Sequence, residues 1–294
     1  MSRETEKIFK DFNKYIEGKE FDSEEEVQKE LAAFMENYNK GLDSNVKSAK
    51  KSADDYLDMA YNATSRDKAI EYAKKALKLD RDLVDARLLI LQFEDDLESV
   101  KKQLEDLIKG ETKRLEKEGY FTDDVGSFWG IIETRPYMRA RDAYIEVLVE
   151  MGKVKKAVSE CEDIIRLNEN DNMGVRYQLM ALYAYLEDAD AAKGLYSKFK
   201  DDSYSMLFPM AVMHYKMDDL GKAGSTLKKI IKNNEDYRNY LSGELTLDKE
   251  QIDKIVLSGM YRQDTIEEVV MAIKTNSILA DSVMYFNNWA SVNI

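Results

Sequence analysis

Residues 157–164 read AVSECEDI, and the same spacing of small or apolar residues recurs at three other places in the chain. The related segments are 69–76 (AIEYAKKA), 192–199 (AKGLYSKF) and 223–230 (AGSTLKKI). In each, the first, fifth and eighth residues share one face of an α-helix. A small first residue lets that helix approach a neighbouring helix closely. The chain is therefore predicted to contain repeated helices, each packed against a preceding apolar helix.

The interval between these segments is nearly constant. Ala157, Ala192 and Ala223 are 35 and 31 residues apart, close to the period of about 34 residues at which tetratricopeptide helix pairs stack into a superhelix. Ala69 lies 88 residues before Ala157, about 20 more than two such repeats require. The excess indicates an insertion. Residues 119–135 lack a helical period and carry several aromatic side chains, so we expect a packed inserted loop there.

The amino-acid composition favours a helical protein and disfavours nucleic-acid-binding and membrane-spanning proteins. The 294 residues are 44% hydrophobic and 34% charged, with 13 Gly and only 2 Pro, which favours amphipathic helices. A net charge of -13 disfavours nucleic acid as a partner. The N-terminus does not read as a signal peptide, and the apolar run 203–215 is shorter than the roughly 20 residues of a membrane span. We expect a cytoplasmic protein with no membrane partner.

Few residues are available for common catalytic chemistry. Cys161 is the single cysteine and His214 the single histidine, so no intramolecular disulfide or thiol pair can form. The carboxylates show no EF-hand spacing, and no glycine-rich phosphate loop occurs. We interpret Cys161 as a small buried hydrophobe and His214 as a packed side chain. No enzyme activity, cofactor or metal is expected.

These patterns predict an all-α fold: a right-handed α-solenoid of about five helix pairs, with an N-terminal helical extension and a C-terminal helical cap. The extension covers residues 1–45, the array 46–235 with its inserted loop 119–135, and the cap 236–294. Predicted helices cover residues 23–38, 53–62, 67–79, 83–92, a long helix ending near 118, 136–151, 174–186, 205–216, 220–232, and a C-terminal helix from 264 toward 280.

Two central stretches carry a family resemblance. Residues 128–140 (FWGIIETRPYMRA) and 167–177 (LNENDNMGVRY) resemble a family of bacterial tetratricopeptide proteins related to the suppression-of-tumorigenicity proteins. Looser likeness extends to residues 21–39 and 234–243. The family commonly has Pro where Glu169 stands and Gln where Met173 stands. The resemblance implies an all-helical repeat fold and a protein-binding role, and it supplies no catalytic residue or cofactor.

The same two stretches supply the candidate binding residues, because both fall at or just before the first helix of a repeat. We expect four arginines to lie near one another: Arg135, Arg139, Arg141 and Arg176. With the helix N-terminus at Asn172, they would hold an acidic group or the C-terminal carboxylate of a partner. In the alternative interpretation, nearby carboxylates neutralise these arginines internally: Glu133, Asp142, Glu146 and Asp171.

Three tyrosines are expected to add apolar contact along the groove: Tyr137, Tyr177 and Tyr185. Ordinary packing within the array is their alternative role, as it is for Phe128 and Trp129 of the inserted loop. The sequence thus predicts a non-enzymatic scaffold or adaptor that recognises a peptide or protein partner in the concave groove of the array. The alternative is a homo-oligomerising module, in which the C-terminal Met284, Phe286 and Trp289 form a homodimer contact.

Overall fold

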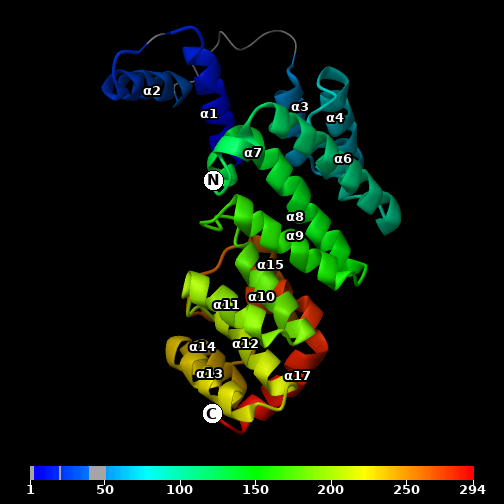
Figure 1. The fold of residues 1–294 in the computed structure, drawn as a ribbon, viewed down its shortest axis with the longest axis vertical. Coiled ribbons are helices and arrows are strands. Elements are labelled where there is room, and N and C mark those ends of the chain that lie inside the picture. The colour runs from blue at the N-terminus through cyan, green and yellow to red at the C-terminus, as the bar shows by residue number, and fades with distance from the viewer. Residues whose placement is uncertain (1–2, 20, 40–50) are drawn as a thin grey trace. The chain divides into compact units, whose positions relative to one another are not determined.

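The computed structural model describes residues 3–19, 21–39 and 51–294. Within these ranges the chain is helical throughout and forms no strand (Figure 1). Its nearest approach to β-structure is a pair of isolated bridges from Gly126 and Ser127 to Asn168. The predicted all-α class is therefore confirmed for the described residues. The expected boundary near residue 45 lies outside them.

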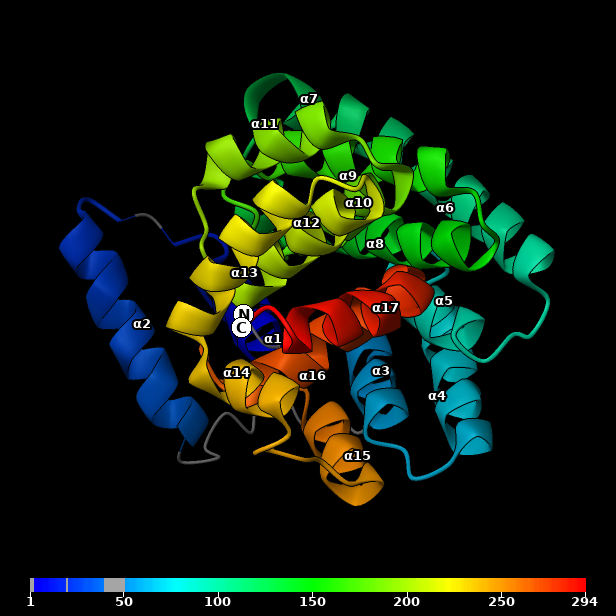
Figure 2. The same cartoon turned by 90° about the horizontal axis from the view of Figure 1, so that it is seen from below.

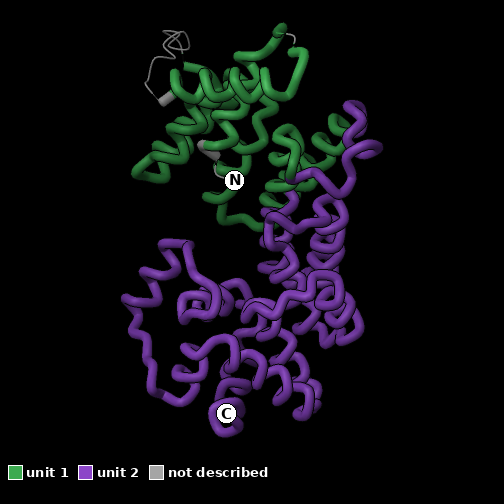
Figure 3. Tube along the Cα trace, turned by 90° about the vertical axis from the view of Figure 1, so that its left-hand side faces the viewer, with its two compact units in different colours: residues 1–115, 130–140 green, residues 116–129, 141–294 purple. Residues whose placement is uncertain are grey.

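The chain divides into two compact units, shown in green and purple in Figure 3. Unit 1 comprises residues 1–115 and 130–140, and unit 2 comprises residues 116–129 and 141–294. This division falls inside the array that the sequence predicts as one domain. The separate extension, array and cap stay a prediction.

Unit 1 is built on α3 to α6, preceded by two further helices. Their bounds are α1 (Arg3–Ile16), α2 (Glu24–Asn39), α3 (Ala53–Tyr61), α4 (Arg66–Leu79), α5 (Val84–Leu91) and α6 (Leu97–Lys117). Unit 1 also contains the 3-10 turn η3 (Ile132–Thr134), near the end of the insertion, and the start of α8 (Arg135–Glu150). A reciprocal capping box between Ser52 and Asp55 begins α3. Helices α3 and α4 lie side by side, and α5 packs on α4 (Figure 2). Their core is formed by Leu57, Ala60, Ala69, Ala73, Ala76, Ala86 and Leu89.

Unit 2 contains the end of α8 and the remaining helices. They are α7 (Tyr120–Asp123), η2 (Phe128–Gly130), α9 (Val154–Leu167), α10 (Val175–Leu186), α11 (Ala189–Phe199), α12 (Tyr204–Lys216), α13 (Leu220–Asn233), α14 (Glu235–Ser242), α15 (Lys249–Ser258), α16 (Ile266–Thr275), η4 (Ser277–Leu279) and α17 (Ala280–Ser291). Helix α10 packs on α9, α11 and α12, and α12 packs on α13. The expected helix pairs up to residue 233 are present with ends close to those predicted.

The four repeated alanines occupy equivalent positions. Ala69, Ala157, Ala192 and Ala223 are each the fourth residue of their helix, in α4, α9, α11 and α13. Each is at most 5% exposed. A larger side chain there would push the paired helices apart, which explains why small residues recur at this spacing.

Three of the helix pairs also share one turn. The residue before the second helix's N-cap is left-handed in each case: Gly152 (φ 69°), Glu187 (φ 60°) and Asp218 (φ 56°). The next backbone N–H then donates to a carbonyl five residues earlier, from Lys153 to Leu148 (2.7 Å), Asp188 to Tyr183 (3.0 Å) and Asp219 to His214 (2.9 Å). This pattern closes the first helix in the manner of a Schellman motif. The repeat is therefore structural as well as compositional.

The inserted loop is packed, as expected. Phe128 is fully buried, and its ring lies 5.1 Å from that of Phe121 in an edge-on arrangement. The Glu169 N–H donates to the Gly126 carbonyl at 2.9 Å, which joins the loop to the residues after α9. Phe121 and Phe128 therefore serve the packing of this segment within unit 2.

The C-terminal helix predicted from residue 264 toward 280 is shorter than expected. Helix α16 ends at Thr275, where the buried Asn276 caps it by donating its N–H to the Ala272 carbonyl at 2.8 Å. The chain then continues through η4 into α17. Helix α16 packs on α10 and α12, and α17 packs on α12 and α14. No helix in the described ranges has the length and apolar character needed to cross a bilayer.

Candidate functional site

The four candidate arginines divide between the two units. Arg135 and Arg139 belong to unit 1, and Arg141 and Arg176 belong to unit 2. Each is engaged with carboxylates of its own unit. The site is therefore described unit by unit.

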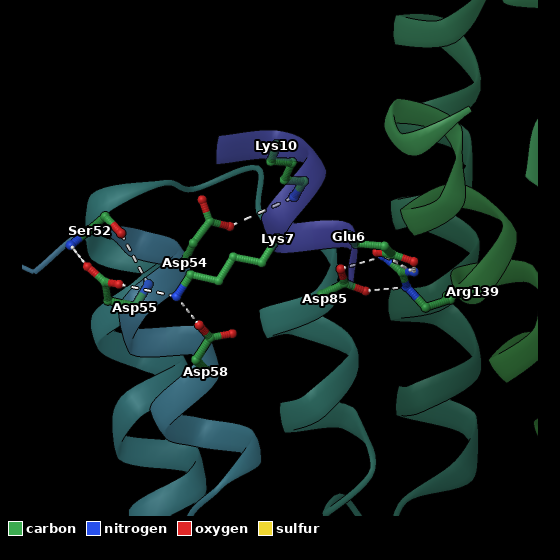
Figure 4. A network of polar contacts seen from close by, with 9 residues as sticks. All are labelled: Glu6, Lys7, Lys10, Ser52, Asp54, Asp55, Asp58, Asp85 and Arg139. Carbon is green, nitrogen blue, oxygen red and sulfur yellow. Dashed lines mark hydrogen bonds and ion pairs between the residues drawn. The ribbon is translucent and has the colours of Figure 1, made fainter. Parts of the chain in front are cut away.

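In unit 1, Arg139 joins two carboxylates from different helices (Figure 4). Its guanidinium donates to both oxygens of Asp85 on α5, at 2.8 and 2.7 Å, and to both oxygens of Glu6 on α1, at 3.0 and 3.1 Å. Arg135 donates to Glu6 at 3.2 Å. Glu6, Asp85 and Arg135 are buried. Burial alone would lower the pKa of Arg139, but Asp85 and Glu6 outweigh it and raise that pKa.

Lys7 and Lys10 of α1 carry the opposite charge, and both face carboxylates of α3. Lys7 forms ion pairs with Asp58 and, at 3.5 Å, with Asp55. Lys10 lies 3.8 Å from Asp54 (Figure 4). Burial would lower the pKa of Lys7, but the hydrogen bond and charge of Asp58 raise it overall. Unit 1 therefore holds α1 through a carboxylate on one side and two ammonium groups on the other.

Tyr137 lies in the interior of unit 1. It is 3% exposed, and its hydroxyl lies 3.3 Å from the Thr112 hydroxyl on α6. A side chain buried to this degree cannot stack on an arriving peptide. The geometry thus favours the packing role for Tyr137.

In unit 2, Arg141 ties α8 to α9. Its guanidinium donates to Glu160 at 3.0 Å and to Asp163, both on α9. The charge of Arg141, with that of Arg166, lowers the pKa of Asp163 against the raising effect of burial. These carboxylates differ from the ones the sequence suggested as partners, because residues 19 and 22 positions later in the chain return to the same place in the helix pair.

Arg176 is held by the loop that begins α10. It pairs with Asp171 at 2.9 Å and with Asp201 at 3.1 Å. The buried Asp171, in a left-handed conformation (φ 47°), also accepts the N–H groups of Val175 and Arg176 at 2.8 and 3.0 Å. Asp171 therefore caps the helix N-terminus that was expected to face a ligand carboxylate. Of the four carboxylates suggested from the sequence, Asp171 is the one that pairs with a candidate arginine.

A cavity of about 950 Å³ opens beside this loop. Three of the candidate residues line it: Asn172, Arg176 and Tyr177. The rest of the wall comes from the end of α8, from α10, and from the C-terminal residues Tyr261, Met271, Lys274, Thr275, Ser277 and Ile278. Arg141 and Tyr185 do not line it. Tyr185 is 45% exposed, with the Lys216 ammonium 5.4 Å from its ring centre.

The α8 wall of the cavity is acidic. Asp142, Glu146 and Glu150 are spaced four residues apart, which places their carboxylates along one face of the helix. None of the three makes an ion pair with another described residue. Burial, with the charges of Glu146 and Asp171, raises the pKa of Asp142 to about 6. Burial also raises the pKa of Glu146, against the opposing charge of Lys274. The carboxylates of the cavity wall outnumber its cations, Lys274 and Arg176, so the cavity presents net negative charge.

Cys161 and His214, to which the sequence assigns packing roles, both have pKa values shifted by burial. Cys161 is fully buried in α9, and burial raises the pKa of its thiol. Burial also lowers the pKa of His214, against the charge of Asp219. The described part of the chain contains no group of three His, Cys, Asp or Glu side chains arranged to hold a metal ion.

Sequence reasoning missed two features of the candidate sites, for different reasons. The ladder Asp142, Glu146 and Glu150 is readable as a one-face spacing, yet its position on a cavity wall is not. Glu6 pairs with Arg135 and Arg139, which lie 129 and 133 positions later in the chain. No local sequence pattern predicts a contact over such a separation. No protein-family model matches the chain, and no curated protein sequence matches it as a relative.

Proposed function

We propose that the chain is a non-enzymatic scaffold, built as a tetratricopeptide-like right-handed α-solenoid, that binds a peptide or protein partner in the cavity of unit 2. The shared turns and the buried alanines of the helix pairs support the repeat architecture. The main support for the binding role is the cavity of about 950 Å³ beside α8 and α10, the first helices of successive pairs. Its carboxylates Asp142, Glu146 and Glu150 make no ion pair with another described residue. Its size suits several residues of a peptide.

The charges of the cavity favour a basic group on the partner. Arg176, the arginine in its wall, is already held by Asp171 and Asp201. A lysine or arginine of the partner would instead satisfy Asp142 and Glu146 and relieve their mutual repulsion. Lys274, across the cavity on α16, makes no ion pair in the described part of the chain. It is available to the acidic group or C-terminal carboxylate that the sequence leads us to expect.

A binding comparison between matched variants tests the proposal. Immobilised heptapeptides with basic, acidic or neutral side chains are the probe, and the full chain is the analyte. We expect basic peptides to be retained, and the variant Asp142→Asn/Glu146→Gln/Glu150→Gln to bind them at least tenfold more weakly. The control Asp190→Asn/Glu244→Gln/Asp281→Asn changes net charge equally at exposed sites of unit 2 and should bind like the parent. Equal loss in both variants, or no retention of any peptide, would refute the proposal.

The C-terminal homodimer is the weaker candidate on this geometry. Phe286, one of its three expected contact residues, is fully buried, with its ring 5.8 Å from that of Phe208. Trp289 packs against Tyr215 at 5.5 Å. Met284 remains exposed, beside Tyr285. Of the three expected contact residues only Met284 is exposed, and one such side chain offers far less apolar surface than a stable dimer interface requires.

A further inference from the structure

Helix α1 is bound to the rest of unit 1 by ion pairs in which the helix contributes charges of both signs. Three of its residues, Glu6, Lys7 and Lys10, meet groups of opposite sign on two helices. Glu6 pairs with Arg135 and Arg139 of α8. Lys7 pairs with Asp55 and Asp58 of α3, and Lys10 with Asp54 of α3. Arg139 also holds Asp85 of α5 (Figure 4). The helix thus presents a carboxylate followed at +1 and +4 by ammonium groups. We call the surface that receives it the α1 seat, formed by Asp54, Asp55, Asp58, Asp85, Arg135 and Arg139.

The fit between α1 and its seat is close. The space left between them is about 30 Å³, lined by the charged residues of both sides and Leu57. That volume is near the size of a single water molecule. The Glu6 side chain is 8% exposed, so its carboxylate exchanges water for two guanidinium groups. Charge complementarity of both signs selects the direction and register of the bound helix.

Two residues of the seat, Arg139 and Asp55, are held by contacts that do not involve α1. Arg139 is already oriented by its two bonds to Asp85, at 2.8 and 2.7 Å. Asp55 is fixed by the Ser52 capping box, in which the Ser52 N–H donates to it at 2.9 Å. A site whose donors and acceptors are held in place beforehand binds a ligand with less ordering cost.

The apolar cluster of α3, α4 and α5, around Leu57, Ala73 and Leu89, contains no described residue of α1. The buried aromatic residue of α1, Phe12, packs instead on Phe34 of α2, with ring centres 5.4 Å apart. Release of α1 would expose charged groups to water without opening the α3–α5 core.

We propose that the α1 seat is an exchangeable helix-binding site, in which α1 is the intramolecular occupant and the external ligand is a partner helix with the same arrangement: a carboxylate followed at +1 and +4 by lysine or arginine. Tethering gives α1 a high effective concentration at the seat. A partner therefore binds when it out-competes α1 or when α1 is displaced. This site is separate from the cavity of unit 2, and its failure would leave the proposed function of that cavity untouched.

The test uses the full chain and a fluorescent peptide of residues 3–19 as the probe, measured by fluorescence anisotropy. Glu6→Lys in the chain places a cation against Arg135 and Arg139, which displaces the tethered α1. We expect this variant to bind the peptide at least tenfold more tightly than the parent chain. Adding Asp54→Asn and Asp58→Asn to Glu6→Lys should remove at least tenfold of that affinity, because both aspartates are partly exposed and their loss spares the core.

Matched peptides test the recognition on one and the same chain, so differences in folding between chain variants do not enter the comparison. The peptide with Glu6→Gln should bind the Glu6→Lys chain at least tenfold more weakly than the unmodified peptide. The control peptide with Lys14→Gln alters an exposed residue and should bind unchanged. Equal binding of the two modified peptides would overturn the proposal, as would equal affinity of the parent and Glu6→Lys chains. Unfolding curves of each chain variant verify that the comparison is made on folded protein.

Discussion

Asp142 is the residue whose ionisation bears most directly on the proposed cavity. Burial and the neighbouring charges of Glu146 and Asp171 raise its pKa from 3.8 to about 6. A carboxyl group with a raised pKa in the folded state favours folding at low pH. That contribution is complete below pH 3.8 and is lost as the pH rises through about 6. At neutral pH the ionised Asp142 therefore lowers the stability of unit 2, by about 3 kcal/mol at most.

Replacing this carboxyl group should stabilise the protein. We expect Asp142→Asn to raise the free energy of unfolding at pH 7.5 by about 1–3 kcal/mol, because the amide carries no charge to bury. The gain should shrink as the pH falls from 6 toward 4, where the native carboxyl group is itself protonated. Urea unfolding at several pH values measures it. The exposed control Asp190→Asn should show little change at any pH. A destabilised Asp142→Asn protein at pH 7.5 would contradict this assignment.

The candidate arginines show how far single residues can be understood from the sequence. The choice between ligand binding and internal pairing was correctly posed, since all four guanidiniums contact carboxylates. Their partners could not be named, because Glu6 and Asp85 reach Arg139 only through the packing of α1 and α5 against α8. Asp171 was identifiable because it lies five residues before Arg176, within reach of the same helix start.

The turns between paired helices allow a prediction of how single substitutions there change the stability of the protein. Gly152 and Glu187 occupy the same left-handed position in successive pairs. An L-residue other than Gly or Asn is disfavoured there by about 1 kcal/mol. We therefore expect Gly152→Ala to destabilise the protein by about 1 kcal/mol and Glu187→Gly to stabilise it by about 0.5 kcal/mol. The gain is reduced by unfolded-chain entropy and by loss of the partly exposed ion pair between Glu187 and Lys216 at 3.4 Å.

The free energies of unfolding of Gly152→Ala and Glu187→Gly, measured by denaturant unfolding, test this prediction. Lys155→Ala, on the exposed face of α9, serves as the control because its backbone is already helical and its side chain lies in solvent. Stability changes of the same sign for Gly152→Ala and Glu187→Gly would show that the two turns are not equivalent. The shared geometry of the helix pairs would then lose its support.

Helix positions follow from local signals, and this is why they were largely predictable. Small residues at the fourth position, turn formers and caps lie within a few residues of the boundaries they set. The C-terminal helix ended early at Thr275 because Asn276 is buried and caps it, and burial depends on the whole unit. The insertion was predicted to be packed from its aromatic content, but its contact with Asn168 required the fold.

At the scale of the whole molecule, the chain combines an acidic surface with internally neutralised arginines. A net charge of -13 attracts basic partners in general, and the cavity of unit 2 adds a row of carboxylates on one wall, where we propose that a basic group is held specifically. The α1 seat differs in kind, since it offers both signs of charge to a helix. Two binding surfaces of different chemistry would suit a scaffold that brings two partners together.

The most direct measurement is an NMR titration of the isotope-labelled full chain with a basic heptapeptide retained in the binding comparison. We predict saturable amide shifts at residues lining the cavity: Asp142, Glu146, Asn172, Tyr177 and Tyr261. Shifts confined to helices α9, α11 and α13, or shifts absent from the cavity at saturating peptide, would contradict the assignment of this cavity as the partner's binding site.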